Sequence, residues 1–299
     1  VKFQNKVWQA FRFSMMHLEH YDPSANRSHS RYDQWIRART GEAVRRVRTA
    51  LDGYRFSDAA NEIYAFTWDE LCDWYLEFAK GTLYNDDADE AAKQGARHTL
   101  WETLHTLVRL FHPIMPFLSE EMWQKLPHTE GSVVVAAYPR AEDYPSDPTS
   151  LETVAQVQGV ITAIRRIRAD MEISPRIPIR LRAEGASDLR RYSEALRDLG
   201  GVESLEDGTK DGPASTFVVG SITFFVPLGD LVDVDSERSR LDKVISKAQQ
   251  DADFLARKLN NTNFVDRAPE HVVNDIRQKY ATAQERLEKL KDARAGLNS

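Results

Sequence analysis

The chain has 299 residues, of which 41% are hydrophobic and 29% are charged, and its formal net charge at pH 7 is −6. This composition is typical of folded domains and argues against a disordered polypeptide, while the length predicts two or three folded units. No run approaches the roughly 20 apolar residues of a membrane-spanning helix, and the N-terminus lacks the order of a signal peptide, so we expect a cytoplasmic protein without a membrane partner.

The first part of the chain predicts long amphipathic helices. Apolar residues recur at spacings of three and four, the repeat of one helical face, over residues 3–18 and again over residues 35–51. Ser57 or Asp58 can cap a third helix, which is expected to reach about residue 79 and to be closed by Gly81.

A fourth helix is expected over residues 87–110 and, after two prolines, a short helix over residues 118–126. Long helices with short polar connections predict a helix bundle. The single cysteine, Cys72, excludes an internal disulfide and a multi-cysteine zinc site, and its aromatic neighbours predict burial. The aromatic residues expected in the core of the bundle are Trp8, Trp35, Phe66, Trp68, Trp74, Trp101 and Trp123.

Residues 129–150 are rich in proline and acids and predict an extended linker. A helix is expected over residues 151–171. The strands expected after it are 177–181, 215–219 and 222–226, with a helix over 189–199. A turn at Gly220 would join the last two strands, so residues 151–232 predict a helix plus a small α/β unit.

The clearest periodicity lies in the last segment, residues 233–299. Apolar residues step by four and three from Leu241 to Leu259, and again from Val273 to Leu290 after a break at 260–269. Pro269 suits the first turn of the second helix. We therefore expect an antiparallel two-helix coiled coil, at the end of a mainly α protein whose bundle occupies residues 1–128.

Charge is unevenly distributed along the chain. Residues 1–60 contain 11 Lys or Arg against 6 acids, and residues 235–299 contain 13 against 11. Residues 61–130 contain 5 against 13, and residues 131–234 contain 11 against 16. The basic ends could meet a phosphate backbone while the acidic middle faces solvent, and a mixed-charge solvated surface is the alternative.

Four blocks of sequence resemble valyl-tRNA synthetases, which are class I aminoacyl-tRNA synthetases. They span nearly the whole chain in the order found in that family, and Gln9 departs from the asparagine that is usual there. The blocks are Asn5-Lys6-Val7-Trp8-Gln9-Ala10-Phe11-Arg12-Phe13, Asp73-Trp74-Tyr75-Leu76-Glu77, residues 112–123 (HPIMPFLSEEMW) and residues 263–269 (NFVDRAP). The single cysteine and the coiled coil favour the valyl over the isoleucyl and leucyl members, whose equivalent fragments are the alternative.

The resemblance implies a tRNA-binding fragment of an enzyme that attaches valine to tRNA(Val) with ATP and Mg. The chain shows no nucleotide-binding signature, lysine-rich mobile loop or phosphate cradle, so we expect no catalytic residue and no cofactor or metal in this fragment. The expected partner is tRNA(Val), with no DNA, and the chain is expected to be a monomer. An interaction module whose coiled coil docks a protein partner is the runner-up, and an enzyme active by itself is a third option.

By resemblance, Lys6, Arg12 and Phe13 are expected to contact the anticodon. An RNA loop presents unstacked bases and phosphates together, and a ring beside cationic groups can bind both. In the arm, the family implies contact with the outer elbow of the tRNA. The candidates there are Arg257, Lys258, Arg277 and Lys279.

Two further patterns carry less information. Arg165, Arg166 and Arg168 on one helix suggest either a phosphate contact or structural pairing with nearby acids. His98, His105 and His112 recur every seven residues, a spacing that does not match the pairs three or four residues apart that hold a metal on a helix.

Overall fold

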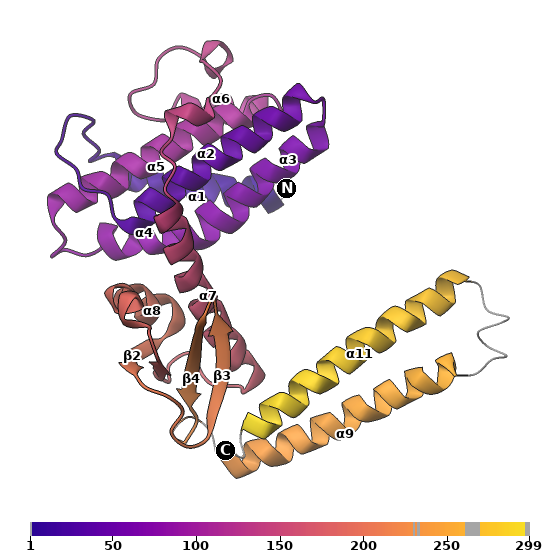
Figure 1. Cartoon of the computed structure of the whole chain (residues 1–299). Coiled ribbons are helices and arrows are strands. Elements are labelled where there is room, and N and C mark those ends of the chain that lie inside the picture. The colour runs from indigo at the N-terminus through magenta and orange to yellow at the C-terminus, as the bar shows by residue number, and fades with distance from the viewer. Residues whose placement is uncertain (1, 230, 232–233, 261–269, 297–299) are drawn as a thin grey trace. The chain divides into compact units, whose positions relative to one another are not determined.

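The computed structural model of the chain describes residues 2–229, 231, 234–260 and 270–296 (Figure 1). Two compact units divide the chain, Val1–Gln156 and Val157–Ser299. The predicted class, mainly α with a bundle, a small α/β unit and a C-terminal helical pair, is confirmed. No helix among the described residues combines the length and apolarity needed to cross a membrane. The predicted boundaries of the four segments stay a prediction.

The first unit is a helix bundle. Its elements are α1 (Lys2–Leu18), α2 (Arg31–Asp52), α3 (Phe56–Ala65), η1 (Phe66–Tyr75), α4 (Leu76–Leu83), α5 (Glu90–Phe111), α6 (Pro116–Trp123) and the 3-10 turns η2 (Val133–Val135) and η3 (Ala141–Asp143). Helix α1 buries Val7, Phe11 and Leu18 and contacts α5 and η1. One face of α1 is therefore used by the core, as its periodicity predicts.

The start of α2 is tied to the middle of the bundle by Asp33. Its carboxylate accepts hydrogen bonds from the backbone N–H and the hydroxyl of Ser30, both at 2.7 Å, which completes a capping box. The hydroxyl of Tyr75 donates to the same carboxylate at 2.6 Å. Burial raises the pKa of Asp33, and these hydrogen bonds act in the opposite direction. A buried polar network thus sets how α2 and η1 pack.

The third predicted helix differs from expectation in three ways. It begins at Phe56, and no side chain caps it, so the expected cap at Ser57 or Asp58 is wrong. Gly81 does not end it, because α4 continues to Leu83. Between α3 and α4 the chain forms the π-helical segment η1, a widened turn that periodicity does not predict.

The predicted aromatic core is only partly right. Trp35, Phe66 and Trp123 are buried, with at most 4% of each residue exposed. The side chains of Trp8, Trp68, Trp74 and Trp101 are half-buried instead. Helical spacing places an aromatic residue on the correct face but does not tell how far the neighbouring helix covers it.

Two histidines of α5 stack in a row of aromatic rings. The ring of His105 lies 4.7 Å from Trp101 and 4.8 Å from Trp123, centroid to centroid, and His98 lies 6.2 Å from Trp101. The Nδ1 atom of His98 is also 2.9 Å from the hydroxyl of Tyr21. Burial, helped by nearby arginines, lowers the pKa of both histidines to about 4.

The bundle should therefore lose stability in mild acid. A histidine whose pKa is lowered by folding contributes stability fully above its ordinary value near 6.5, and this contribution is lost as the pH falls towards 4. After allowance for partial exposure, we expect a loss of about 1 kcal/mol per histidine, measured by urea denaturation at pH 7 and pH 4.5. His105→Phe keeps a ring in the stack and should reduce this pH-dependent loss. If His105→Phe loses as much stability between pH 7 and pH 4.5 as the unchanged protein, His105 is not a source of the loss.

Helix α7 (Pro148–Asp170) leads into the α/β unit, whose sheet has the order β2-β1-β4-β3. Its other elements are β1 (Ile179–Ala183), η4 (Ser187–Tyr192), α8 (Ser193–Gly200), β2 (Val202–Asp207), β3 (Ala214–Val219) and β4 (Ile222–Pro227). Strands β3 and β4 form the expected hairpin, with Val219 opposite Ile222. Strand β2 is not among the predicted strands, and it runs parallel to β1 after the crossover through α8.

The C-terminal arm consists of α9 (Val234–Leu259) and α11 (Glu270–Gly296), which pack along one another. Leu241, Ala248 and Ala252 of α9 and Val273 and Leu287 of α11 are buried in their seam. The predicted helical pair is confirmed, and cross-helix contacts 2.8 Å long between Arg294 and Asp242 show that the helices run antiparallel. The resembling block at 263–269, including Pro269, lies outside the described residues.

Candidate nucleic-acid interface

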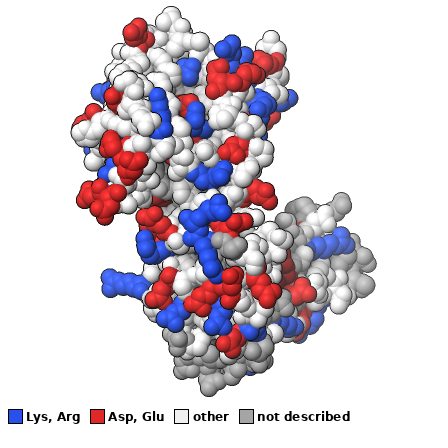
Figure 2. All heavy atoms as spheres, turned by 60° about the vertical axis from the view of Figure 1, so that its left-hand side comes forward, with Lys and Arg blue, Asp and Glu red and all other residues white. Residues whose placement is uncertain are grey.

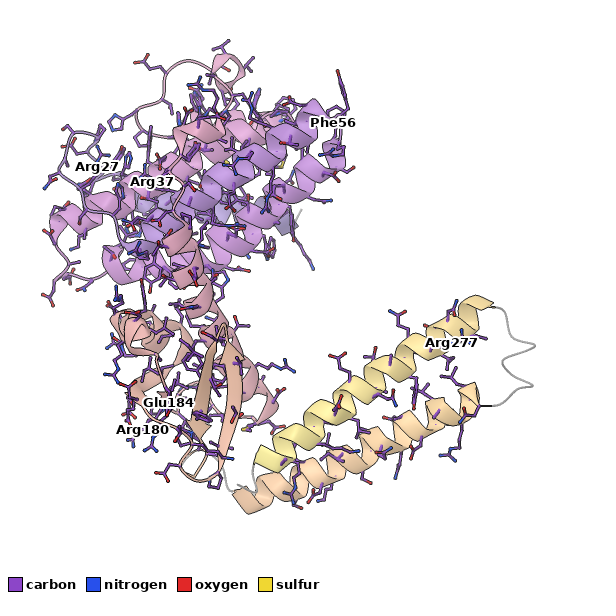
Figure 3. All side chains as sticks on the ribbon, viewed as in Figure 1. Arg27, Arg37, Phe56, Arg180, Glu184 and Arg277 are labelled. Atoms are coloured by element: carbon purple, nitrogen blue, oxygen red, sulfur yellow. The ribbon has the colours of Figure 1, made fainter. Side chains whose placement is uncertain are left out.

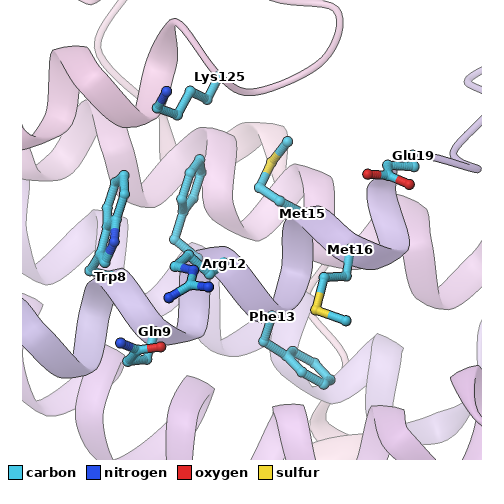
Figure 4. A pocket seen from close by; sticks show the side chains of 9 residues that line it. Trp8, Gln9, Arg12, Phe13, Met15, Met16, Glu19 and Lys125 are labelled. Atoms are coloured by element: carbon cyan, nitrogen blue, oxygen red, sulfur yellow. The ribbon is translucent and has the colours of Figure 1, made fainter.

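The exposed side of α1 borders a hollow of about 620 Å³. Its lining residues belong to α1, apart from Glu19, which directly follows α1, and Lys125, which follows α6 (Figure 4). They are Trp8, Gln9, Phe11, Arg12, Phe13, Met15, Met16, Glu19 and Lys125. The floor is apolar, because the ring of Trp8 stacks on the buried ring of Phe11 at 5.7 Å, and Met16 is 64% exposed. An apolar hollow of this size with a few charged groups suits a ligand the size of a nucleoside.

Arg12 supplies the unpaired positive charge of the hollow. Its side chain is exposed, and within the described residues it has neither an ion pair nor a hydrogen bond. Lys125 adds a second cation, which forms an ion pair of 3.1 Å with Glu121. A planar guanidinium without a partner can stack on a base or bind a phosphate at little cost.

Phe13 lies at the edge of the hollow in a small aromatic cluster. Its ring meets His17 edge-on at 4.9 Å and Tyr84 at 6.2 Å, and the Nζ atom of Lys80 is 5.7 Å from its centre. Burial lowers the pKa of His17, so this ring stays neutral near pH 7. Phe13 is thus half-buried and still reaches the surface that Arg12 occupies.

Lys6 lies outside the hollow. Its ammonium group forms an ion pair with Asp73 of η1 at 2.5 Å and sits 3.7 Å from the centre of the Trp68 ring. Both contacts attach α1 to η1 and balance the charge of Lys6 within the bundle. The structure therefore brings Arg12 and Phe13 together and leaves Lys6 apart from them.

Four cations of the basic N-terminal segment, residues 1–60, pair with acids of the acidic segment 61–130 that follows it. Arg37 pairs with Glu102 at 2.6 Å, and Arg39 pairs with Glu70 at 2.5 Å. The expectation that the acidic middle faces solvent alone is wrong for these carboxylates. On the face that Figure 2 shows, basic and acidic side chains are interspersed. Cations without a carboxylate partner within the described residues, such as Arg12, are therefore the better candidates for binding an anion.

The arm presents its four candidate residues on the exposed surfaces of α9 and α11. Arg257 donates to a backbone carbonyl at 3.3 Å and Arg277 to the side chain of Asn274 at 3.3 Å, so within the described residues both bond only neutral acceptors (Figure 3 labels Arg277). Lys258 lies 4.8 Å from the ring of Phe254, which is 55% exposed. Lys279 differs, because it pairs with Asp275 at 2.7 Å.

The arginine cluster of α7 is not one shared surface. Arg168 is buried and donates to the backbone carbonyls of Ser174, Gly200 and Gly201. Arg166 pairs with Asp170 at 3.6 Å, and Arg165 donates to a carbonyl of α8. Arg168 is thus structural and bonds carbonyls, whereas Arg166 pairs with an acid, which was one of the two alternatives for this cluster.

Sequence reasoning missed Trp8, Glu19 and Lys125 as residues of the hollow. Trp8 precedes Arg12 by four positions and Glu19 follows it by seven, spacings that fall on one helical face, so this signal was present in the sequence. Lys125 had no such signal, because folding brings it to α1 from more than 100 positions away. Within the described residues, no group of three or more His, Cys, Asp or Glu is placed to hold a metal.

Two family models match the chain. The model described as "Anticodon-binding domain of tRNA ligase" matches residues 33–183, and "Valyl tRNA synthetase tRNA binding arm" matches residues 233–298. The second range contains all four candidates of the arm. The hollow on α1 lies before the first range.

Relatives cover nearly the whole chain, α1 included. The chain is 39% identical to the valine–tRNA ligase of Geobacter sulfurreducens over 96% of its length, which is 34% of that protein. It is 34% identical to the valine–tRNA ligase of Thermotoga maritima over 97% of its length and 36% identical to that of Coxiella burnetii over 99%. The chain spans about a third of the length of these relatives.

Proposed function

Because the chain belongs to the valyl-tRNA synthetase family, with its anticodon-binding domain and its tRNA-binding arm, we propose that it binds tRNA(Val) at two places. The hollow on α1 would hold part of the anticodon loop, and the arm would lie against the outer elbow. The observation that carries the first part is the guanidinium of Arg12, unpaired within the described residues, beside half-buried aromatic rings and the exposed thioether of Met16.

At the bundle, a base that leaves the loop would lie over the apolar floor of the hollow. Stacking on an aromatic side chain contributes about 1 to 3 kcal/mol per base and tolerates any base, so Trp8 and Phe13 would supply affinity. Arg12 would bind the neighbouring phosphate or stack on a second base. Lys6 would contribute less, since phosphate has to compete with Asp73 for its ammonium group.

At the arm, Arg257 and Arg277 are the better candidates, because neither bonds a carboxylate in the part of the chain that the structure describes. Lys258 would present its ammonium group beside the exposed ring of Phe254, a combination that suits a flat surface of bases with phosphates around it. Lys279 would have to exchange its partner Asp275 for a phosphate. Surface ion pairs of this kind are weak, so such an exchange costs little.

The activity of the whole enzyme is part of the proposal. A protein three times as long, like the relatives, would attach valine to tRNA(Val) with ATP and Mg, and this chain would hold the tRNA during the reaction. We propose that it acts as a monomer in the cytoplasm and does not bind DNA.

Arg12→Ala and Arg257→Ala should each weaken binding of tRNA(Val) about tenfold, because each removes a contact between a cation and RNA. Each should also reduce the slope of log affinity against log salt by about one ion. Filter binding over a salt series measures both quantities. Arg140→Ala is the matched control, since that exposed arginine pairs with Asp143 at 3.4 Å and belongs neither to the lining of the hollow nor to the arm.

An unrelated RNA of equal length decides whether recognition is specific. If the chain binds it as tightly as tRNA(Val) at moderate salt, the proposed anticodon contact is wrong. A protein retained in stoichiometric amount by a chain with no affinity for RNA would favour the scaffold alternative.

A further inference from the structure

We propose that Glu19 is a specificity-determining residue of the α1 hollow. Its carboxylate accepts a hydrogen bond from the exocyclic amino group of an unstacked anticodon base, so the hollow admits adenine, cytosine or guanine and disfavours uracil. This inference rests on the proposed function, because it concerns the same RNA contact.

The position and surroundings of Glu19 carry the argument. It follows the last residue of α1, is exposed, and lines the hollow seven positions after Arg12, which is about 10 Å along a helix on nearly the same side. Trp8 and Glu19 lie at opposite ends of the row of labelled side chains (Figure 4). Within the described residues, Glu19 has no ion pair and accepts no hydrogen bond. Its full charge is thus available to a ligand.

An unpaired carboxylate is unfavourable beside an RNA backbone. Phosphates repel it, and each phosphate drawn in by Arg12 or Lys125 would increase that repulsion. The carboxylate favours binding only if the RNA places a hydrogen-bond donor at this end of the hollow. In an RNA loop the strong donors that carry sequence information are the base edges.

The chemistry of the bases then decides which are accepted. Cytosine, adenine and guanine each present an exocyclic amino group, and glutamate is a known acceptor for the amino group of cytosine. Uracil has no exocyclic amino group, and where cytosine presents one uracil presents a carbonyl oxygen, which a carboxylate repels; guanine presents its amino group at C2. The apolar floor formed by Trp8, Met15 and Met16 binds any base equally, so selection falls to the group at the edge.

The genetic code supplies an independent check. All valine codons begin with G and U, so the two anticodon bases that pair with them are C and A. Both carry an exocyclic amino group, and neither is uracil. A carboxylate acceptor therefore suits the anticodon that the proposed function requires.

The test uses a short anticodon stem-loop RNA of tRNA(Val), which lacks the elbow and reports on the bundle alone. In each of two further RNAs, one of the two anticodon bases, either the A that pairs with the codon U or the C that pairs with the codon G, is replaced by U. We expect the unchanged protein to bind at least one of these about tenfold more weakly. In Glu19→Gln the ratio of the affinities for the unchanged and the substituted RNA should fall to about twofold, because an amide can also donate to the carbonyl of uracil. The salt slope should stay the same, since no phosphate contact is lost.

Glu142→Gln is the matched control, an exposed acid of the same unit that has no place in the hollow, and it should keep the tenfold ratio. If Glu19→Gln strengthens or weakens binding of all three RNAs equally, the carboxylate acts only through its charge and the inference is wrong. A retained tenfold ratio in Glu19→Gln overturns it as well. Failure of the unchanged protein to bind any stem-loop would instead refute the proposed anticodon contact.

Discussion

Replacement of Gly95 by alanine is expected to destabilise the helix bundle by about 3 kcal/mol or more. A Cβ atom at Gly95 would lie 1.9 Å from the backbone oxygen of Ser28 and 2.8 Å from its carbonyl carbon. The same stretch is attached to α5 by a hydrogen bond of 2.9 Å from the backbone N–H of Ser28 to the carbonyl of Ala91. Backbone cannot turn aside as a flexible side chain can, so the segment before α2 has to move away from α5.

Gly81→Ala is the matched control for this substitution. Gly81 also lies in a helix of the bundle, and a Cβ atom there would meet nothing within 4 Å. Alanine favours the helical conformation by about 1 kcal/mol, so this variant should be unchanged or slightly more stable. Urea denaturation followed by circular dichroism compares the two free energies of unfolding. Equal values for the two variants would show that α5 and the Ser28 segment are not in close contact.

Replacement of Arg168 by methionine is expected to destabilise the α/β unit by about 3 kcal/mol. The guanidinium donates to the carbonyl of Ser174 at 2.8 Å, to that of Gly201 at 3.1 Å and to that of Gly200 at 3.4 Å. It therefore ties α7 to the turn where α8 ends and β2 begins. Methionine has a similar length but no donor, so buried carbonyl groups would lose their hydrogen-bond partners.

Arg166→Met separates this effect from a general loss of charge. Arg166 is two positions away on the same helix, and its exposed ion pair with Asp170 is worth at most about 1 kcal/mol. Arg168→Lys should recover only part of the stability, because an ammonium group cannot reach three carbonyls in the way that a planar guanidinium does. Calorimetry of Arg166→Met, Arg168→Met and Arg168→Lys measures the order of their stabilities. A loss in Arg166→Met as large as in Arg168→Met would contradict this account.

Helices and their apolar faces could be predicted from the sequence because their signals are local. Residues three and four apart meet on one helical face, so the steps from Leu241 to Leu259 predict a paired helix without further information. Strand β2 shows the opposite case. Its sequence, Val202–Asp207, contains three acids and no clear alternation, and it becomes a strand because β1 offers a parallel partner.

The candidate site divides in the same way. Resemblance selected Arg12 and Phe13, and both prove to lie at the hollow, but the sequence could not show that Arg12 is unpaired while Lys6 is engaged by Asp73. Lys6 and its partner Asp73 are 67 positions apart in the sequence. Such pairs depend on how α1 packs against η1, and the π-helical turns of η1 change which side chains face α1.

By itself, the sequence determined the helical class of this protein, the two paired helices of its arm and the family whose blocks it carries, because these depend on neighbours along the chain. Only the tertiary structure decided which charges are free to bind RNA. Lys6, Arg37, Arg39 and Arg46 of the N-terminal segment pair with acids of the segment that follows, whereas Arg12 and Glu19 form no ion pair within the described residues. An ion pair forms where folding places two groups within a few ångströms, and no local pattern records that distance.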